Sequence, residues 1–158
     1  MDSDLDDPEE EGRLIRIGGA IDATAVSLLI SGDDLSPDEI TRLLGFPPSR
    51  SWSKGETRPV GKSGRVSTFP TGRWVLESPK GKGDLDKHIS WILDVLTADL
   101  QIWQGIRIRY GLNLFCGLFL EDWNRVASIS AHLLSELGKR GIALDLDIYA
   151  FSPDDEQP

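Results

Sequence analysis

The segment 49–72 combines positive charge with an indole ring, residue types suited to holding an anion or a protein partner. It contains five basic residues and a single acid, Glu56, within a chain of net charge −9. Trp52 lies among the bases, and tryptophan beside arginine is typical of interaction hot spots. The same composition could hold phosphate or stack a nucleobase. The alternative is a solvated loop with Trp52 packed on the domain. We expect a partner surface that consists of Trp52, Lys54, Arg58, Arg73 and Trp74.

Residue types that carry out catalysis are few and scattered. His88 and His132 have no second histidine or cysteine at metal-ligand spacing, so we expect no metal site and no cofactor. Cys116 lies in an apolar stretch, where a thiol behaves as an inert hydrophobe. His88 with Asp84 nearby could act as a general base, although a histidine on a helix flank is more often packed or exposed. We expect no catalytic residues, and therefore a binding domain rather than an enzyme.

Two further patterns have ordinary structural explanations. Asp145 and Asp147 would lie on one face of a strand, about 7 Å apart, which could suit hydrolytic acid–base chemistry. An exposed strand face explains them equally well. The sequence Gly-Lys-Ser-Gly at 61–64 lacks the earlier glycine and the apolar strand that a phosphate-binding loop needs.

Length and composition indicate one ordinary globular domain. The chain has 158 residues, enough for a single core without disulfides. Its one cysteine excludes an internal disulfide, and no apolar run approaches the roughly 18–20 residues that span a bilayer. We expect a cytoplasmic protein with no membrane partner.

The negative charge belongs to the ends of the chain. Residues 2–11 hold seven acids and residues 154–156 hold three, whereas the rest of the chain has 16 acids against 17 basic residues. Like charges with almost no apolar residues cannot offset the entropy lost on ordering. We expect disordered acidic tails at 1–12 and 152–158, flanking one α+β domain at 13–151.

The order of predicted elements indicates the architecture. Apolar spacing and turn signals predict a strand, a helix and the long basic loop, and then the order βαββαβ. These last six elements have the order of a ferredoxin-like core, preceded by an extra strand and helix. We expect a mixed or mostly antiparallel sheet with helices packed mainly on one face. Strands are expected at 23–31, 72–78, 106–110, 112–120 and 142–151, and helices at 36–45, 85–96 and 128–138.

Three local predictions carry particular weight. Residues 23–31 are continuously apolar or small, as in a buried strand with both faces covered. Residues 106–110 alternate, which predicts a strand that follows a short helical stretch ended by Gly105. The basic loop 49–72 should contain little regular structure beyond a short hairpin.

The chain resembles a bacterial family filed as domain of unknown function 4279. The similarity extends from about 24 to 151 and depends on four stretches taken together. The family has no agreed activity, so the resemblance implies no catalytic residues. The stretches are Ser-Gly-Asp-Asp-Leu-Ser-Pro-Asp-Glu-Ile at 31–40, Trp-Ser-Lys-Gly-Glu at 52–56, Gly-Arg-Trp-Val-Leu-Glu-Ser at 72–78 and Leu-Asp-Leu-Asp-Ile-Tyr at 144–149.

These observations give three alternative hypotheses for the function. The leading hypothesis is binding of another protein, for example neutralisation of a toxin as immunity proteins do. The second is binding of a nucleotide or nucleic acid by the basic loop, which the net charge disfavours. The third is an unrecognised hydrolase or transferase that uses His88. The sequence leaves the oligomeric state open.

Overall fold

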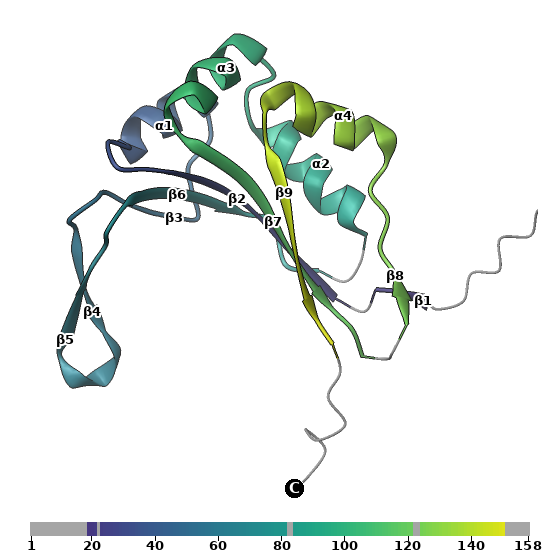
Figure 1. Cartoon of the computed structure of the whole chain (residues 1–158), viewed down its shortest axis with the longest axis horizontal. Helices are drawn as coiled ribbons and strands as arrows, with labels where there is room; N and C mark the ends of the chain where they lie inside the picture. The colour runs from purple at the N-terminus through teal and green to yellow at the C-terminus, as the bar shows by residue number, and fades with distance from the viewer. Residues whose placement is uncertain (1–18, 22, 82–83, 122–123, 151–158) are drawn as a thin grey trace, which may run out of the picture.

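A five-stranded sheet is the centre of the fold in the computed structural model, which describes residues 19–21, 23–81, 84–121 and 124–150 (Figure 1). The strand order is β3-β6-β2-β7-β9. Strand β2 is antiparallel to β6 and β7, β3 is antiparallel to β6, and β7 and β9 are parallel. The strands are β2 (Ala23–Gly32), β3 (Arg50–Trp52), β6 (Gly72–Glu77), β7 (Gly111–Phe119) and β9 (Ala143–Tyr149).

The α-helices of the described residues lie on one side of this sheet, as Figure 1 shows. The predicted α+β class is confirmed, with a mostly antiparallel sheet and helices on one face. The predicted ferredoxin-like topology is not confirmed. The helices are α1 (Pro37–Leu44), α2 (Leu85–Val95), α3 (Leu100–Arg109) and α4 (Ala131–Arg140).

Two small strand pairs lie outside the main sheet. Strands β4 (Thr57–Val60) and β5 (Arg65–Thr68) form an antiparallel hairpin around the short 3₁₀ helix η1 (Gly61–Ser63). Strands β1 (Gly19–Ala20) and β8 (Arg125–Val126) pair in parallel. The expected acidic tails lie outside the described residues.

The core forms where alternate strand residues meet the helices. Leu28, Ile30, Trp74 and Leu114 are fully buried on the helix side of the sheet. Neighbouring strands place these side chains in register, because Leu28 lies opposite Leu76 of β6 and opposite Leu114 of β7. One continuous apolar layer therefore joins the sheet to the helices.

Helix α1 forms as its local signals predict. The Glu39 N–H donates to the Ser36 side chain over 3.4 Å, and Pro37 occupies the first helical position. Gly45 ends the helix with φ of 79°, a conformation that favours glycine.

The predicted strand at 106–110 is wrong, because these residues form the end of helix α3 and its cap. Trp103, Ile106 and Tyr110 follow helical spacing and are all buried, whereas Ile108 is 80% exposed. The strand interpretation required Ile106 and Ile108 to face the same way. The apolar residues of 106–110 fit both the strand period and the helix period. Burial of the helix face that carries Trp103 selects the helix.

This change removes one strand from the expected order. Gly105, predicted to end the helical stretch, lies inside α3. The chain passes from β6 through α2 and α3 to β7, and then through α4 to β9. With the two-residue strand β8 left aside, the elements from β6 to β9 therefore run βααβαβ instead of βαββαβ.

The prediction that residues 23–31 are covered on both faces is also wrong. Val26, Leu28 and Ile30 point toward the helices and are buried, but Ala25 is exposed and Leu29 is half-buried on the other side. We call this side of the sheet, away from the helices, the open face. It carries the odd-numbered residues of β2, β6, β7 and β9.

The basic segment has more regular structure than expected. It contains β3, and residues 57–68 form the β4–β5 hairpin, which we call the hairpin arm. Figure 1 shows the arm leaving the β3 edge of the sheet and projecting on the side opposite to the helices. The segment is thus an ordered projection mounted on the sheet edge.

Candidate functional site

An aromatic stack holds the base of the hairpin arm. The rings of Trp52 and Phe69 lie 4.6 Å apart between centroids, inclined by 25°. The indole Nε1–H of Trp52 donates to the Thr71 carbonyl over 3.1 Å. The backbone of Phe69 exchanges hydrogen bonds of 2.8 and 2.9 Å with Gly55 and Glu56. The aromatic predicted for the partner surface therefore anchors the arm to the sheet.

Arg58 belongs to this base rather than to a free surface. Its guanidinium lies 5.8 Å from the Trp52 ring centroid and 5.4 Å from that of Phe69. It pairs with Glu56 over 3.1 Å and donates to the Ser51 carbonyl over 2.6 Å. The pKa of Glu56 is lowered, mainly by the Ser53 backbone N–H and then by Arg58. The positive charge of Arg58 is thus compensated within the chain.

Lys54 is compensated in the same way. Its ammonium group pairs with Asp33, which lies in the turn after β2. Hydrogen bonds from Lys54 and then from Thr71 lower the pKa of Asp33. This ion pair joins the turn at the base of the arm to the central strand.

Arg73 differs from Arg58 and Lys54. It lies on the open face beside Trp52, with its guanidinium 5.8 Å from the indole centroid. Its Nε is buried without a hydrogen-bond partner among the described residues, and no carboxylate of those residues pairs with it. Arg73 therefore retains an uncompensated charge next to the arm.

Trp74 cannot contact a partner in this structure. It points to the helix side of β6, is fully buried, and donates from Nε1 to the Thr41 hydroxyl over 3.0 Å. Of the five residues predicted for the surface, four gather around the base of the arm and Trp74 belongs to the core. Alternation along β6 puts Trp74 on the side of Leu76, opposite to Arg73.

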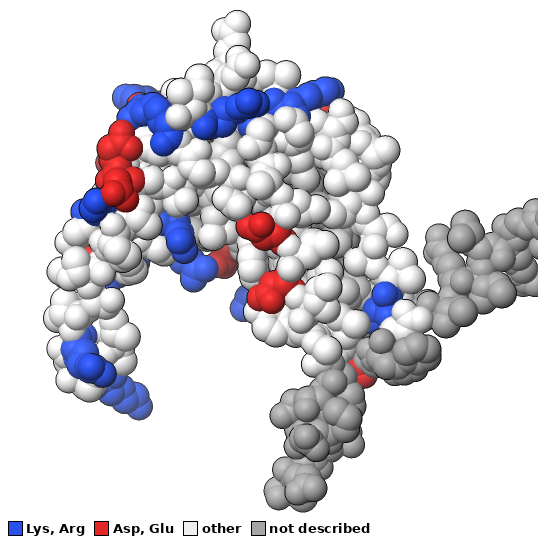
Figure 2. All heavy atoms as spheres, viewed as in Figure 1, with Lys and Arg blue, Asp and Glu red and all other residues white. Residues whose placement is uncertain are grey.

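The tip of the arm holds cations that the predicted set left out. Lys62 and Arg65 are exposed, and neither has a carboxylate partner among the residues that the structure describes. Val60 and Val66 are 52% and 65% exposed beside them. Figure 2 shows the basic side chains gathered at the end of the arm.

A serine–histidine contact occurs at the end of β6. The Ser78 hydroxyl and His88 Nδ1 are 2.9 Å apart, and His88 is 7% exposed. His88 also lines a cavity of about 200 Å³ together with Lys87 and Trp91. Asp84, the acid considered beside His88, instead caps α2 by accepting the Asp86 N–H over 3.0 Å. Among the described residues, no carboxylate orients the imidazole.

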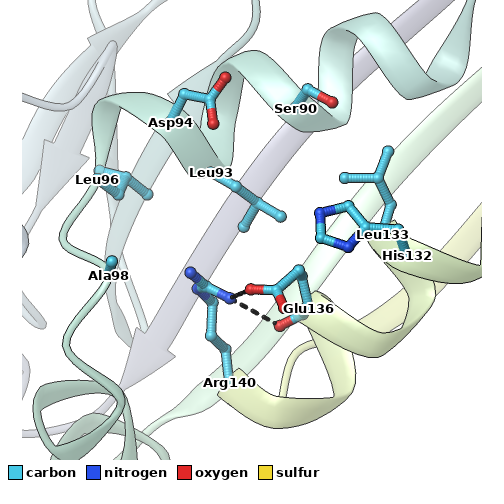
Figure 3. A pocket seen from close by; sticks show the side chains of 9 residues that line it. All are labelled: Ser90, Leu93, Asp94, Leu96, Ala98, His132, Leu133, Glu136 and Arg140. Atoms are coloured by element: carbon cyan, nitrogen blue, oxygen red, sulfur yellow. Dashed lines mark hydrogen bonds and ion pairs between the residues drawn. The ribbon is translucent and has the colours of Figure 1, made fainter.

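A second cavity of about 260 Å³ lies between α2 and α4 (Figure 3). Ser90 and Asp94 of α2 line it together with Glu136 and Arg140 of α4, and Leu93 extends from α2 toward Arg140. Arg140 is 5% exposed and donates to the Glu136 carboxylate over 2.6 Å and to its carbonyl over 3.0 Å. Hydrogen bonds from Lys139 and then Arg140 lower the pKa of Glu136 to about 2. These bonds give Arg140 a structural role at the end of α4.

Metal and thiol chemistry find no support in the described part of the chain. No group of three potential metal ligands occurs there. Cys116 is buried in β7, and burial raises the pKa of its thiol to about 11. Within the same residues, no helix is long and apolar enough to cross a membrane.

Comparisons with known proteins identify the family and nothing more specific. No curated protein and no solved structure matches the chain. Residues 22–151, which include the sheet, the four helices and the hairpin arm, match a family described as a domain of unknown function (DUF4279). The match covers most of the chain and agrees with the resemblance seen in the sequence. The chain belongs to the DUF4279 family.

Proposed function

We propose that this domain acts by binding another protein through its hairpin arm. The observation that carries the proposal is the arm itself, a two-stranded hairpin that stands away from the domain with every residue of β4 and β5 exposed. A hairpin of two strands is marginally stable in water unless something packs against it. A partner that covers the arm would supply the missing contacts.

The strand edges of the arm support the same function. In the described part of the chain, β4 and β5 pair only with each other, so each has one unpaired edge. Unpaired edges readily accept another strand. Pro59 lacks an N–H and blunts β4, so the edge of β5 is the better acceptor.

The charge of the arm indicates the chemistry of the partner surface. Lys62 and Arg65 have no carboxylate among the described residues, and Val60 and Val66 lie exposed beside them. A partner surface with acidic groups beside apolar side chains would complement this arrangement. Complementary charge would mainly speed association and select the partner.

Nucleic acid is a weaker candidate for the ligand. Trp52 already stacks on Phe69, and the guanidinium groups of Arg58 and Arg73 lie near its ring. A nucleobase would have to displace these contacts in order to stack. The net charge of −9 also opposes attraction to a phosphate backbone.

Neutralisation of a toxin is one concrete form of the proposal. Residues 2–11 hold seven acids, and an acidic segment could complement the basic surface of a nuclease. Deletion of residues 1–12 should then weaken capture of the toxin. A toxin-like gene next to the gene for this chain would support this form.

A charge-reversal pull-down tests the proposed function. The full chain, immobilised at low salt, should capture a host protein that mass spectrometry identifies and that binds again when purified. The K62E/R65E variant should lose at least ten-fold in affinity for it. The R42E/K87E variant makes the same change of net charge on α1 and α2 and should bind normally. Equal binding by both variants would refute the role of the arm.

A hydrolase that uses Ser78 and His88 is the second candidate, favoured by their 2.9 Å contact beside a cavity. His88 would take the hydroxyl proton as Ser78 attacks the acyl carbon of an ester and would pass it to the departing alcohol, and water would then hydrolyse the acyl-serine to the acid. A fluorophosphonate probe should then label Ser78 in the wild type and leave the S78A variant unlabelled. Failure to label the wild type would remove this candidate.

A further inference from the structure

We infer that the protein bound by the hairpin arm is a second copy of this chain, with each arm lying across the open face of the other subunit. The inference rests on the proposed function and names its partner. Two uncovered surfaces of the same molecule have complementary charge, and the strand order places them at opposite edges of the sheet within one chain.

The first surface is the open face near β9. Ser27 and Leu29 of β2 and Phe115 of β7 are half-buried there. Phe119 and Tyr149 stack at 4.7 Å between centroids, yet remain 41% and 47% exposed. Parallel strand pairs such as β7 and β9 are normally covered on both faces. The open face therefore carries uncovered apolar side chains, mainly those of Phe115, Phe119 and Tyr149.

Two carboxylates lie beside this apolar area. Asp145 accepts from Asn113 Nδ2 over 2.8 Å, and Asp147 accepts from the Tyr149 hydroxyl over 2.6 Å. Neither carboxylate has a basic partner in the described part of the chain. Figure 2 shows acidic groups on the body of the domain, separated from the basic end of the arm.

The second surface is the arm, which has the opposite charge and a similar mixture of side chains. Its tip presents Lys62 and Arg65, and Val60 and Val66 are exposed on its strands. If the arm lay across the open face, its bases could pair with Asp145 and Asp147 while Val60, on the same face of the hairpin as Arg65, covered apolar residues. Each surface would thus supply the groups that the other lacks.

The strand order separates the two surfaces within one chain. The arm leaves the sheet at β3, and the two carboxylates lie on β9, the opposite edge. Four strand spacings separate these edges, about 19 Å in all. In Figure 1 the arm lies at the left of the domain, apart from β9, which runs down through its centre.

In a dimer with two-fold symmetry, the contact between arm and open face would occur twice. Each subunit would give one arm and receive one, so both uncovered surfaces would be used in a closed dimer. The arm contributes 12 residues, 57–68, and the open face around β2, β7 and β9 contributes a similar number. This total is close to the roughly 20–30 residues per side of an ordinary stable interface.

Charge exchange between separate chains tests the dimer. Light scattering should give the full chain twice its 17.4 kDa mass at micromolar concentration. The K62E/R65E chain and the D145K/D147K chain should each be monomeric, and an equimolar mixture should recover the dimer because each altered surface then meets its complement. The R42E/K87E chain is the control and should remain dimeric. Added salt should weaken the wild-type dimer.

The outcomes separate this inference from the proposed function. A wild-type chain that stays monomeric, or a dimer that both charge reversals leave intact, overturns the inference. If such a monomer still captures a host protein through its arm, protein binding by the arm stands and only the identity of the partner is wrong. If neither dimer nor capture depends on the arm, both are refuted.

Cross-linking tests the same contact without the charge-reversal variants, so it gives an answer even if those variants fold poorly. K62C and D147C chains, mixed and treated with a short bis-maleimide, should give a covalent heterodimer. The native Cys116 is buried and should not react. Absence of the mixed adduct, with each cysteine separately reactive, would also overturn the inference.

Discussion

Trp52 and Phe69 stack face to face across the base of the hairpin arm, with ring centroids 4.6 Å apart. Trp52 ends β3, and Phe69 directly follows β5. The stack therefore joins the two points where the arm meets the sheet. A segment of polar, glycine-rich sequence can remain ordered because its two ends are held together in this way.

Replacement of Phe69 by alanine should loosen the arm. An aromatic pair contributes about 0.5–1.5 kcal/mol beyond its buried area, so F69A should lower the free energy of unfolding by about 1–3 kcal/mol. Urea denaturation measures the loss, and hydrogen exchange should show faster exchange in residues 57–68. The V66A variant is the control, because Val66 is 65% exposed and should cost under about 0.5 kcal/mol. Similar losses in both variants would contradict the anchoring role of the stack.

Two glycine substitutions should have effects of opposite sign. A Cβ on Gly72 would lie 2.9 Å from the Gly32 carbonyl oxygen and 3.1 Å from Leu35 Cβ, so G72A should destabilise by about 1–3 kcal/mol. Gly105 is exposed within α3 and has no neighbouring atom within 4 Å of the added Cβ. Alanine there should stabilise the helix by about 0.5–1 kcal/mol. Thermal unfolding of both variants measures the difference, and a destabilising G105A would count against helix α3.

The ion pairs of Glu136 should make the free energy of unfolding depend on pH in the acid range. Its pKa is lowered to about 2 by Lys139 and then Arg140, whereas an unfolded glutamate titrates near 4.3. The folded state therefore gains stability above about pH 4.3 and loses it as the pH falls toward 2. The free energy of unfolding of the wild type should fall across this window. The E136Q variant should show a shallower fall, and an unchanged slope would refute the assignment.

The Cys116 thiol should be unreactive in the folded protein. Its pKa of about 11, raised by burial and then by the charge of Asp145, leaves little thiolate at pH 8. Ellman's reagent should react roughly 100-fold more slowly with the folded chain than with the chain in urea. Fast labelling without denaturant would mean that β7 opens readily near Cys116.

Local signals in the sequence determined several elements. Ser36, Pro37 and Gly45 act within α1 itself, so no distant contact was needed to predict that helix. The β6 alternation correctly separated Trp74 from Arg73, because strand period depends on the backbone alone. Phe69, an aromatic residue in a polar segment, is also a sequence signal for a partner of Trp52.

Tertiary structure decided the conformation and the exposure of segments whose local sequence fits more than one structure. Residues 106–110 fit both strand and helix periods, and burial of Trp103 and Ile106 selected the helix. One face of β2 is open because the four helices pack on the other face. No local sequence pattern predicts on which face the helices pack. The charges of Lys54 and Arg58 are compensated, whereas those of Lys62 and Arg65 are free of carboxylate partners among the described residues. The composition gives the number of charged residues but not their pairing. Asp33 and Lys54 are 21 residues apart in the sequence, so only the folded chain brings them together.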